Sequence, residues 1–119
     1  MSNAFDSANY PNEIAPVLQK GDYWTWKRSD LAVDYPLADY SLKYKFHLIS
    51  GSTAANFTIN ATESNNEYVF ATSSTSSHAA GDYRWTAIIT KTSGSVEVIV
   101  SEGYLSIVDD AVRSHAKIV

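Results

Sequence analysis

The sequence predicts an all-β fold built from seven to eight short strands. Apolar and polar residues alternate over residues 40–49, which places Leu42, Tyr44 and Phe46 on one face of a strand. The same period of two recurs along most of the chain, and turn-forming residues separate the runs at intervals of about 8–12 residues. This combination is typical of a single immunoglobulin-like antiparallel β-sandwich. A closed barrel with the same alternation is the alternative architecture.

The chain has the length of one domain. Its 119 residues divide into an N-terminal arm (residues 1–13), the β-sandwich domain (residues 14–108) and a C-terminal tail (residues 109–119). A domain of this size buries roughly two-thirds of the surface of its unfolded chain, which is enough for a core without covalent staples. The sequence contains no cysteine, which excludes disulfides and thiolate metal sites.

The first half of the chain supplies three strands. Residues 14–18 form a short edge strand, because the proline among them lacks the N–H donor that a central strand needs. Residues 22–27 form a second strand that places Trp24 and Trp26 on one face. Residues 28–38 form a long connection that leads into the alternating strand described above.

The second half of the chain continues the alternation. Strands are expected at residues 56–62, 67–72, 81–90, 96–100 and 103–107. A hairpin turn joins the first two of these strands, and a serine-rich, mobile loop at residues 73–80 precedes the third. Asp109 and Asp110 could cap a short C-terminal helix, although a helix of that length is marginal by itself.

Charge and hydropathy exclude two classes of partner. The formal net charge is −4, and the nine basic residues are scattered rather than gathered in a stripe, so nucleic acid is not expected as a partner. No apolar run approaches the roughly 18 residues of a membrane span, and no secretion signal begins the chain. We therefore expect a soluble protein of the cytosol that binds neither nucleic acid nor membrane.

The sequence shows no constellation of catalytic or metal-ligating residues. The carboxylates of Asp30, Asp34 and Asp39 lack the spacing of a calcium loop. The three histidines are not spaced as zinc ligands, and neither a nucleophile elbow nor a phosphate-binding glycine loop occurs. The sequence therefore predicts no enzyme, no metal and no cofactor.

The aromatic residues support two interpretations. Trp26 and Trp85 are expected in the core, because a sandwich without cysteine fills its interior with large rings. Trp24, Tyr35 and Tyr40 could instead form an exposed platform on which sugar rings stack. A carbohydrate-binding module is therefore the alternative function.

Several short segments follow one another in an order that spans nearly the whole chain. They are Tyr10-Pro11, Gly21-Asp22, Trp26-Lys-Arg-Ser-Asp30, Tyr35-Pro36, Leu42-Lys-Tyr-Lys-Phe46, Ala80-Gly-Asp-Tyr-Arg-Trp85, Val96-Glu-Val98, Glu102-Gly-Tyr-Leu-Ser-Ile-Val108 and Arg113-Ser-His-Ala116. In this order they resemble a family of small β-sandwich proteins from tailed phages and prophages. Members of that family continue past Arg-Ser-His-Ala into a helical segment, so the resemblance implies a shortened C-terminus here.

The resemblance implies a non-catalytic structural or assembly protein encoded in the head and head–tail gene region. Such a protein would act through protein–protein contacts, alone or as a homo-oligomer, in the bacterial cytoplasm or within a phage particle. The strand pattern does not require residues 28–39 or 113–119, so we expect the contacts there. The candidate contact residues are Trp24, Arg28, Asp30, Tyr35, Tyr40, Arg113 and His115.

Overall fold

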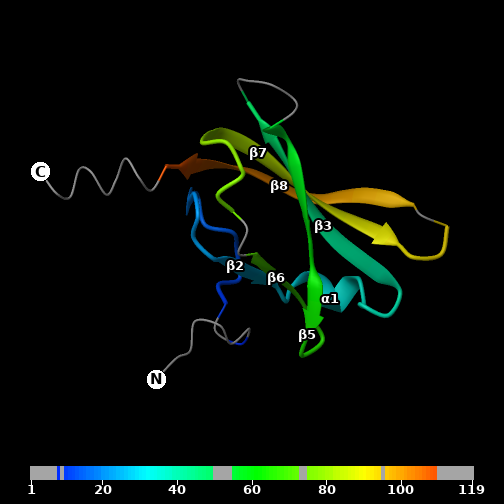
Figure 1. Ribbon diagram of the computed structural model, residues 1–119. Helices are drawn as coiled ribbons and strands as arrows, with labels where there is room; N and C mark the ends of the chain where they lie inside the picture. Colours follow the sequence, from blue (N-terminus) through cyan, green and yellow to red (C-terminus); the bar gives the residue numbers. More distant parts are fainter. Residues whose placement is uncertain (1–7, 9, 50–54, 73–74, 95, 110–119) are drawn as a thin grey trace, which may run out of the picture.

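The computed structural model describes residue 8 and residues 10–49, 55–72, 75–94 and 96–109. The elements in chain order are β1 (Val17–Gln19), β2 (Trp24–Arg28), α1 (Leu31–Asp34), β3 (Tyr40–Leu48), β4 (Phe57–Asn60), β5 (Thr62–Ser64), β6 (Glu67–Thr72), β7 (Gly81–Lys91) and β8 (Glu97–Val108). The strands form a five-stranded sheet in the order β1-β8-β7-β3-β4 and a three-stranded sheet in the order β2-β6-β5. The larger sheet curls around the smaller one like half a barrel (Figure 1).

The β-rich, two-sheet prediction is confirmed, but the larger sheet is not purely antiparallel. β1 runs parallel to β8, with Val17 opposite Ser106 and Gln19 opposite Val108. The other pairings among the described strands are antiparallel. A parallel pair needs a long connection. Here the connection is the rest of the sandwich, since β1 and β8 are the first and last strands in the sequence.

The strand expected at residues 56–62 is in fact two strands in different sheets. β4 pairs with β3 in the large sheet, and β5 pairs with β6 in the small sheet, so the chain crosses between them at Ala61. The alternation continues through the crossing, because Phe57, Ile59 and Ala61 all pack against the core. A period of two therefore could not reveal the change of sheet.

The two strands expected at residues 96–100 and 103–107 are one continuous strand, β8. The register against β7 shifts by one residue, so that Val100 has no opposite residue. This is a β-bulge, which bends a strand without ending it. The glycine that suggested a strand boundary, Gly103, lies inside the strand.

The connection at residues 28–38 contains α1, a single helical turn that the sequence analysis did not predict. Four residues are too few to show a helical period. In this turn Leu31 is buried in the core, Ala32 packs against the core, and Val33 and Asp34 are exposed. No helix in the described part of the chain is long and apolar enough to cross a membrane.

Aromatic rings, rather than a disulfide, fill the space between the two sheets. Trp26 of β2 stacks on Phe70 of β6 with ring centroids 4.5 Å apart, and it meets Tyr44 of β3 at 5.3 Å. Tyr44 stacks in turn on Trp85 of β7 at 4.8 Å. Trp26 is fully buried, as predicted, whereas Trp85 is half-buried at the margin of the core.

The serine-rich loop before β7, which we expected to be mobile, is tied to the core at three points. The hydroxyl of Tyr83 donates a hydrogen bond to the backbone oxygen of Ala79 at 2.7 Å. Thr75 is fully buried and donates to a backbone oxygen of the loop before β2 at 2.7 Å. The ring of His78 stacks on Phe57 with centroids 3.7 Å apart. These contacts hold the loop from Thr75 onward.

We predict that Trp26→Ala lowers the free energy of unfolding by ~3–5 kcal/mol, because it empties the centre of the aromatic stack. Urea unfolding measures this loss. Trp26→Phe is the control, since it keeps a ring in the stack and removes an indole N–H that has no hydrogen-bond partner among the described residues. The phenylalanine variant should lose much less stability. An equal loss in both variants would contradict the role assigned to the ring.

We also predict a pH dependence of stability that originates at His78. Burial lowers the pKa of His78 from its ordinary 6.5, so the unfolded chain binds this proton more readily than the folded chain does. The contribution of His78 is therefore complete above about pH 6.5 and is lost as the pH falls below it. The melting temperature should drop between about pH 7 and pH 5, ahead of the range in which carboxylates titrate.

Two variants test this assignment. His78→Phe keeps a stacked ring without a titrating group and should flatten the curve in that pH range. His47→Gln is the matched control, because His47 is exposed on a strand, and it should leave the curve unchanged. A curve for His78→Phe that matches the parent chain would show that another group is responsible.

Candidate functional site

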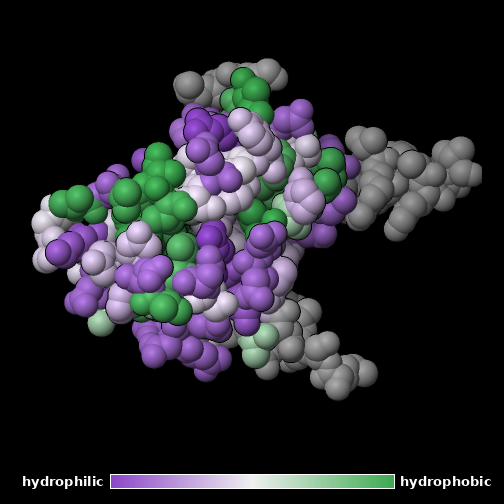
Figure 2. Space-filling view, turned by 180° about the vertical axis from the view of Figure 1, so that it is seen from behind, coloured by the Kyte–Doolittle hydropathy of each residue, from purple (hydrophilic) through white to green (hydrophobic). Residues whose placement is uncertain are grey.

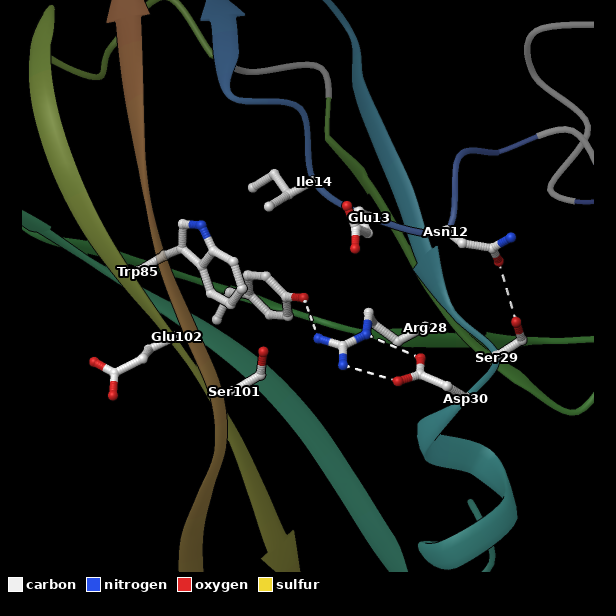
Figure 3. Close-up of a pocket in the computed structure, with 10 residues that line it drawn as sticks. Asn12, Glu13, Ile14, Arg28, Ser29, Asp30, Trp85, Ser101 and Glu102 are labelled. Atoms are coloured by element: carbon white, nitrogen blue, oxygen red, sulfur yellow. Dashed lines mark hydrogen bonds and ion pairs between the residues drawn. The ribbon is translucent and has the colours of Figure 1, made fainter.

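A pocket of about 630 Å³ opens between the two sheets (Figure 3). The end of β2 and the segment before β1 form one side of it, and β7 and β8 form the other. Its volume falls in the range of about 300–1,000 Å³ that is usual for ligand sites. Its lining residues are Asn12, Glu13, Ile14, Arg28, Ser29, Asp30, Tyr44, Trp85, Ser101 and Glu102.

Arg28, Asp30 and Tyr44 form a hydrogen-bonded group along one wall of the pocket. Arg28 is the last residue of β2, and its Nε and Nη2 donate to the two carboxylate oxygens of Asp30 at 3.0 and 2.9 Å. Its Nη1 donates to the hydroxyl of Tyr44 at 2.9 Å. The two parallel bonds to the carboxylate fix the plane of the guanidinium. The group thus ties the turn before α1 to both sheets.

The hydrogen bonds and the burial in this group stabilise the protonation states that Arg28, Asp30 and Tyr44 ordinarily have near pH 7. The hydrogen bonds that Arg28 donates to the Asp30 carboxylate raise the pKa of Arg28 and lower the pKa of Asp30. Burial raises the pKa of Tyr44. A carboxylate with a lowered pKa is a weak general base, and a phenol with a raised pKa stays protonated near pH 7. The arrangement therefore suits binding better than acid–base chemistry.

Trp85 forms the floor of the pocket, and Gly103 makes room for it. The two residues are opposite each other in the β7–β8 pairing. A Cβ atom on Gly103 would lie 2.6 Å from the indole ring, which is too close for any side chain. Glycine at this position allows the ring to lie against the backbone of β8 while it stays stacked on Tyr44.

The lining of the pocket carries more negative than positive charge. Glu13 and Glu102 join Asp30 there, and Arg28 is the one cation among the lining residues. Glu102 also pairs with Arg84 of β7. No three His, Asp or Glu side chains in the described ranges gather closely enough to hold a metal ion. The pocket therefore suits a polar or basic group that lies against an aromatic floor.

One edge of β8 lies uncovered beside the pocket. β1 pairs only with residues 106–108 of β8. The segment before β1 starts beside β2, where the oxygen of Pro11 accepts from the N–H of Lys27 at 2.8 Å. It reaches β8 only at Pro16, whose oxygen accepts from the N–H of Ser106 at 3.0 Å. Residues 97–105 of β8 therefore have no neighbouring strand on that side among the described residues.

The uncovered edge is rich in exposed apolar side chains. Val98, Ile99 and Tyr104 are 50%, 58% and 70% exposed, and Val96, just before β8, is 65% exposed. Figure 2 shows apolar side chains gathered at the end of the molecule that carries the β7–β8 hairpin. An open, apolar edge strand is a template for pairing with another chain, which soluble proteins usually guard against with charges or proline. We therefore regard this edge, together with the pocket, as the candidate interaction site.

The structure places two of the seven predicted contact residues in the pocket. Arg28 and Asp30 both line the pocket. Trp24 is only 2% exposed, so the prediction of an exposed platform that includes this ring is wrong, and its Nε1 donates to a backbone oxygen at 2.7 Å. Tyr35 and Tyr40 are half-buried and pack edge to face with centroids 5.4 Å apart. Because Trp24 and Trp26 are buried on the core side of β2, neither indole ring has a face open to a sugar.

The remaining predictions concern parts that the structure does not describe. Arg113, His115 and the short helix expected in the C-terminal tail lie outside the described residues. The sequence analysis missed Glu13 and the uncovered edge. The run of valine and isoleucine at residues 96–100 was a signal for that edge. The run predicts a strand but not its place in the sheet, because a pattern of side chains does not show which strand lies at an edge.

In comparisons with known proteins, no family model matches the chain and no curated protein shows significant similarity to it. The pocket and the uncovered edge are therefore the features that bear on the function of the chain.

We predict that Gly103→Ala displaces the Trp85 ring, because the new methyl group would overlap it. The strain should cost about 1–3 kcal/mol of unfolding free energy, as is usual for overpacking. The indole N–H signal of Trp85 in a nuclear magnetic resonance spectrum should shift clearly. Ser101→Ala is the control, since Ser101 lies on the same strand and also lines the pocket, and it should leave that signal nearly unchanged. An unmoved signal in Gly103→Ala would contradict this account of the floor.

Proposed function

We propose that this chain is a non-catalytic structural or assembly protein that acts through protein–protein contacts. Its rigid sandwich would present the edge of β8 and the adjoining pocket to a neighbouring protein. The single observation that carries the proposal is the uncovered, apolar stretch of β8 at residues 97–105. Exposed apolar side chains on an unpaired strand are costly for a protein that works alone, and they are useful for one that is completed by a partner.

Three features support an immunoglobulin-like scaffold for this role. The order β2-β6-β5 corresponds to strands B, E and D of that fold, and the order β8-β7-β3 corresponds to G, F and C. Tyr83, near the start of the strand that corresponds to F, bonds back to Ala79 in the manner of a tyrosine corner. Trp85 lies two residues further on, where antibody domains carry the second cysteine, and it joins the aromatic stack in place of a disulfide.

The pairing of Asp30 with Arg28 in the pocket supports a non-catalytic role. The carboxylate of Asp30 accepts from Arg28 on both oxygens, and its pKa is lowered, so it is a weak base toward a substrate. The same pairing leaves the aromatic floor and the remaining carboxylates as surfaces for a protruding polar or basic side chain. A pocket beside an open strand edge is the usual arrangement in strand addition, in which the backbone gives affinity and the pockets give specificity.

The resemblance to small phage and prophage proteins gives the proposal its biological setting. A head or head–tail component joins many copies or several partners into one particle, and contact through an exposed edge serves that purpose. We therefore place the chain among phage or prophage structural and assembly proteins. Its place of action would be the bacterial cytoplasm and the assembling particle.

Site-specific photocrosslinking in cells that assemble the particle tests this proposal. A photoreactive residue at position 98 or 99 should yield discrete protein adducts, because both side chains lie on the exposed edge. Mass spectrometry of the adducts should identify head or head–tail proteins, or the chain itself.

Val33 provides the matched control for that experiment. It is 80% exposed and lies on α1, which is not part of the sheet that contains β8. The same photoreactive residue at position 33 should give few adducts. Equal adducts from positions 33 and 99 would mean that the edge is not the contact surface.

A further inference from the structure

We propose that the uncovered edge of β8 binds an extended segment of a partner protein, and that this segment inserts a lysine or arginine side chain into the pocket. The inference rests on the proposed function, since it names the chemistry of the segment that the same edge would receive. It follows from the direction of the backbone groups of β8, from the spacing of the side chains along the edge, and from the charges in the pocket.

Alternate residues of β8 turn their backbone N–H and C=O groups toward the uncovered side. The N–H of Ser106 donates to the oxygen of Pro16, just before β1, at 3.0 Å, so the backbone groups of Ser106 face that side. Because these directions alternate along a strand, the backbone groups of Tyr104 and Glu102 face it as well. β1 pairs with residues 106–108 and does not reach these two residues. They offer two donors and two acceptors to an added strand.

The same argument extends beyond the bulge. The oxygen of Val96 accepts from the N–H of Lys91 at 2.9 Å, so Val96 faces β7 and the next residue, Glu97, faces the uncovered side. Ile99 faces it by the same alternation. Backbone groups without a strand partner among the described residues therefore lie on both sides of the bulge at Val100. A segment that bonds to them would continue the large sheet from the point where β1 begins.

The spacing along the edge sets which side chains of the segment face inward. On β7, Ala87 lies opposite Ser101 and Ile89 lies opposite Val98. A regular strand on the other side of β8 has about the same spacing, so one residue faces Ser101 and the residue two positions along faces Val98. Ser101 lines the pocket, and Val98 is exposed. The first of these side chains would therefore enter the pocket, and the second would cover an apolar position.

The charges in the pocket favour a cation at the first position. Arg28 donates to both carboxylate oxygens of Asp30, so these two charges offset each other. Glu13 has no ion-pair partner among the described residues. Glu13 lines the pocket from the segment before β1, and Ser101 lines it from β8 (Figure 3). A lysine or arginine side chain that enters beside Ser101 would donate to the Glu13 carboxylate.

The β8 edge of a second copy is a poorer occupant. β8 contains no lysine or arginine, so it has no cation to offer to Glu13. The bulge at Val100 also bends this edge, and a flexible segment follows a bend more easily than the edge of a second sheet does. Charge and shape therefore both favour a basic, extended segment of a partner protein.

A short peptide tests the proposal on the whole chain. The probe is acetyl-Thr-Val-Thr-Arg-Thr-Val-Thr-amide, in which a valine lies two residues from the arginine on either side. The peptide reads the same in both directions, so it fits a parallel or an antiparallel addition. Threonine fills the other positions because it favours strands. The matched peptide carries glutamine in place of arginine, and nuclear magnetic resonance follows the binding of both.

The arginine peptide should protect alternate amides of β8. Hydrogen exchange at Glu102 and Tyr104 should slow, because their N–H groups gain partners. Exchange at Gly103, which faces β7, should stay nearly unchanged. The glutamine peptide should bind about tenfold more weakly, because it lacks the charged donor for Glu13.

Two variants of the chain locate the charge contact. Glu13→Gln should weaken binding of the arginine peptide about tenfold and hardly change binding of the glutamine peptide, because only the cation loses its partner. Glu63→Gln is the matched control, since it makes the same change in net charge on β5 of the other sheet. It should leave both affinities unchanged. Melting curves establish that both variants fold.

Three results would overturn the proposal. These are unchanged exchange at Glu102 and Tyr104 with the arginine peptide at millimolar concentration, equal binding of the two peptides, and an unchanged affinity for the arginine peptide in Glu13→Gln. The crosslinking experiment distinguishes these failures from failure of the proposed function. Discrete adducts from position 99, together with any of the three results, would leave the contact role standing and replace only the chemistry of the partner.

Discussion

The aromatic stack between the two sheets is the interaction on which the rest of this structure depends. Without cysteine, the sheets are held at their separation by Trp26, which lies on Phe70 and against Tyr44. The position of Tyr44 then places its hydroxyl where Arg28 can donate to it. The same ring supports Trp85. The wall and the floor of the pocket thus follow from one packing arrangement, which fully buries Trp26, Tyr44 and Phe70.

The pocket and the uncovered edge share a second cause, which is the short first strand. β1 pairs with only three residues of β8, because the segment ahead of it lies beside β2 and crosses over at Pro16. A longer first strand would have covered the edge and closed the opening between the sheets. The candidate interaction site is therefore the part of the large sheet that the described residues leave without a neighbouring strand. The glycine at position 103 adds to it by letting Trp85 lie at that opening.

The alternation of side chains predicted most of the strands but not how they are joined into sheets. The strand around Tyr44 and the burial of Trp26 follow directly from a period of two. The same period continues through Ala61, where the chain changes sheet, and through Val100, where a bulge replaces an expected break. Arg28 and Asp30 could be predicted as contact residues, because they lie in a long, charged connection that the strand pattern does not require. The uncovered edge could not be found that way, since it depends on which strands become neighbours.

The edge of β8 differs from a well-guarded edge in the way its charges are used. Glu97 and Glu102 would normally discourage another strand, but each is neutralised by a cation of its own sheet, Lys43 or Arg84. The bulge remains as the one device against pairing, and it acts only against straight, rigid partners. A short, flexible segment of a partner would follow such a bend more easily than the rigid edge of a second sheet would. That selectivity would suit the assembly role proposed above, because an unguarded, flat edge strand is a template for aggregation.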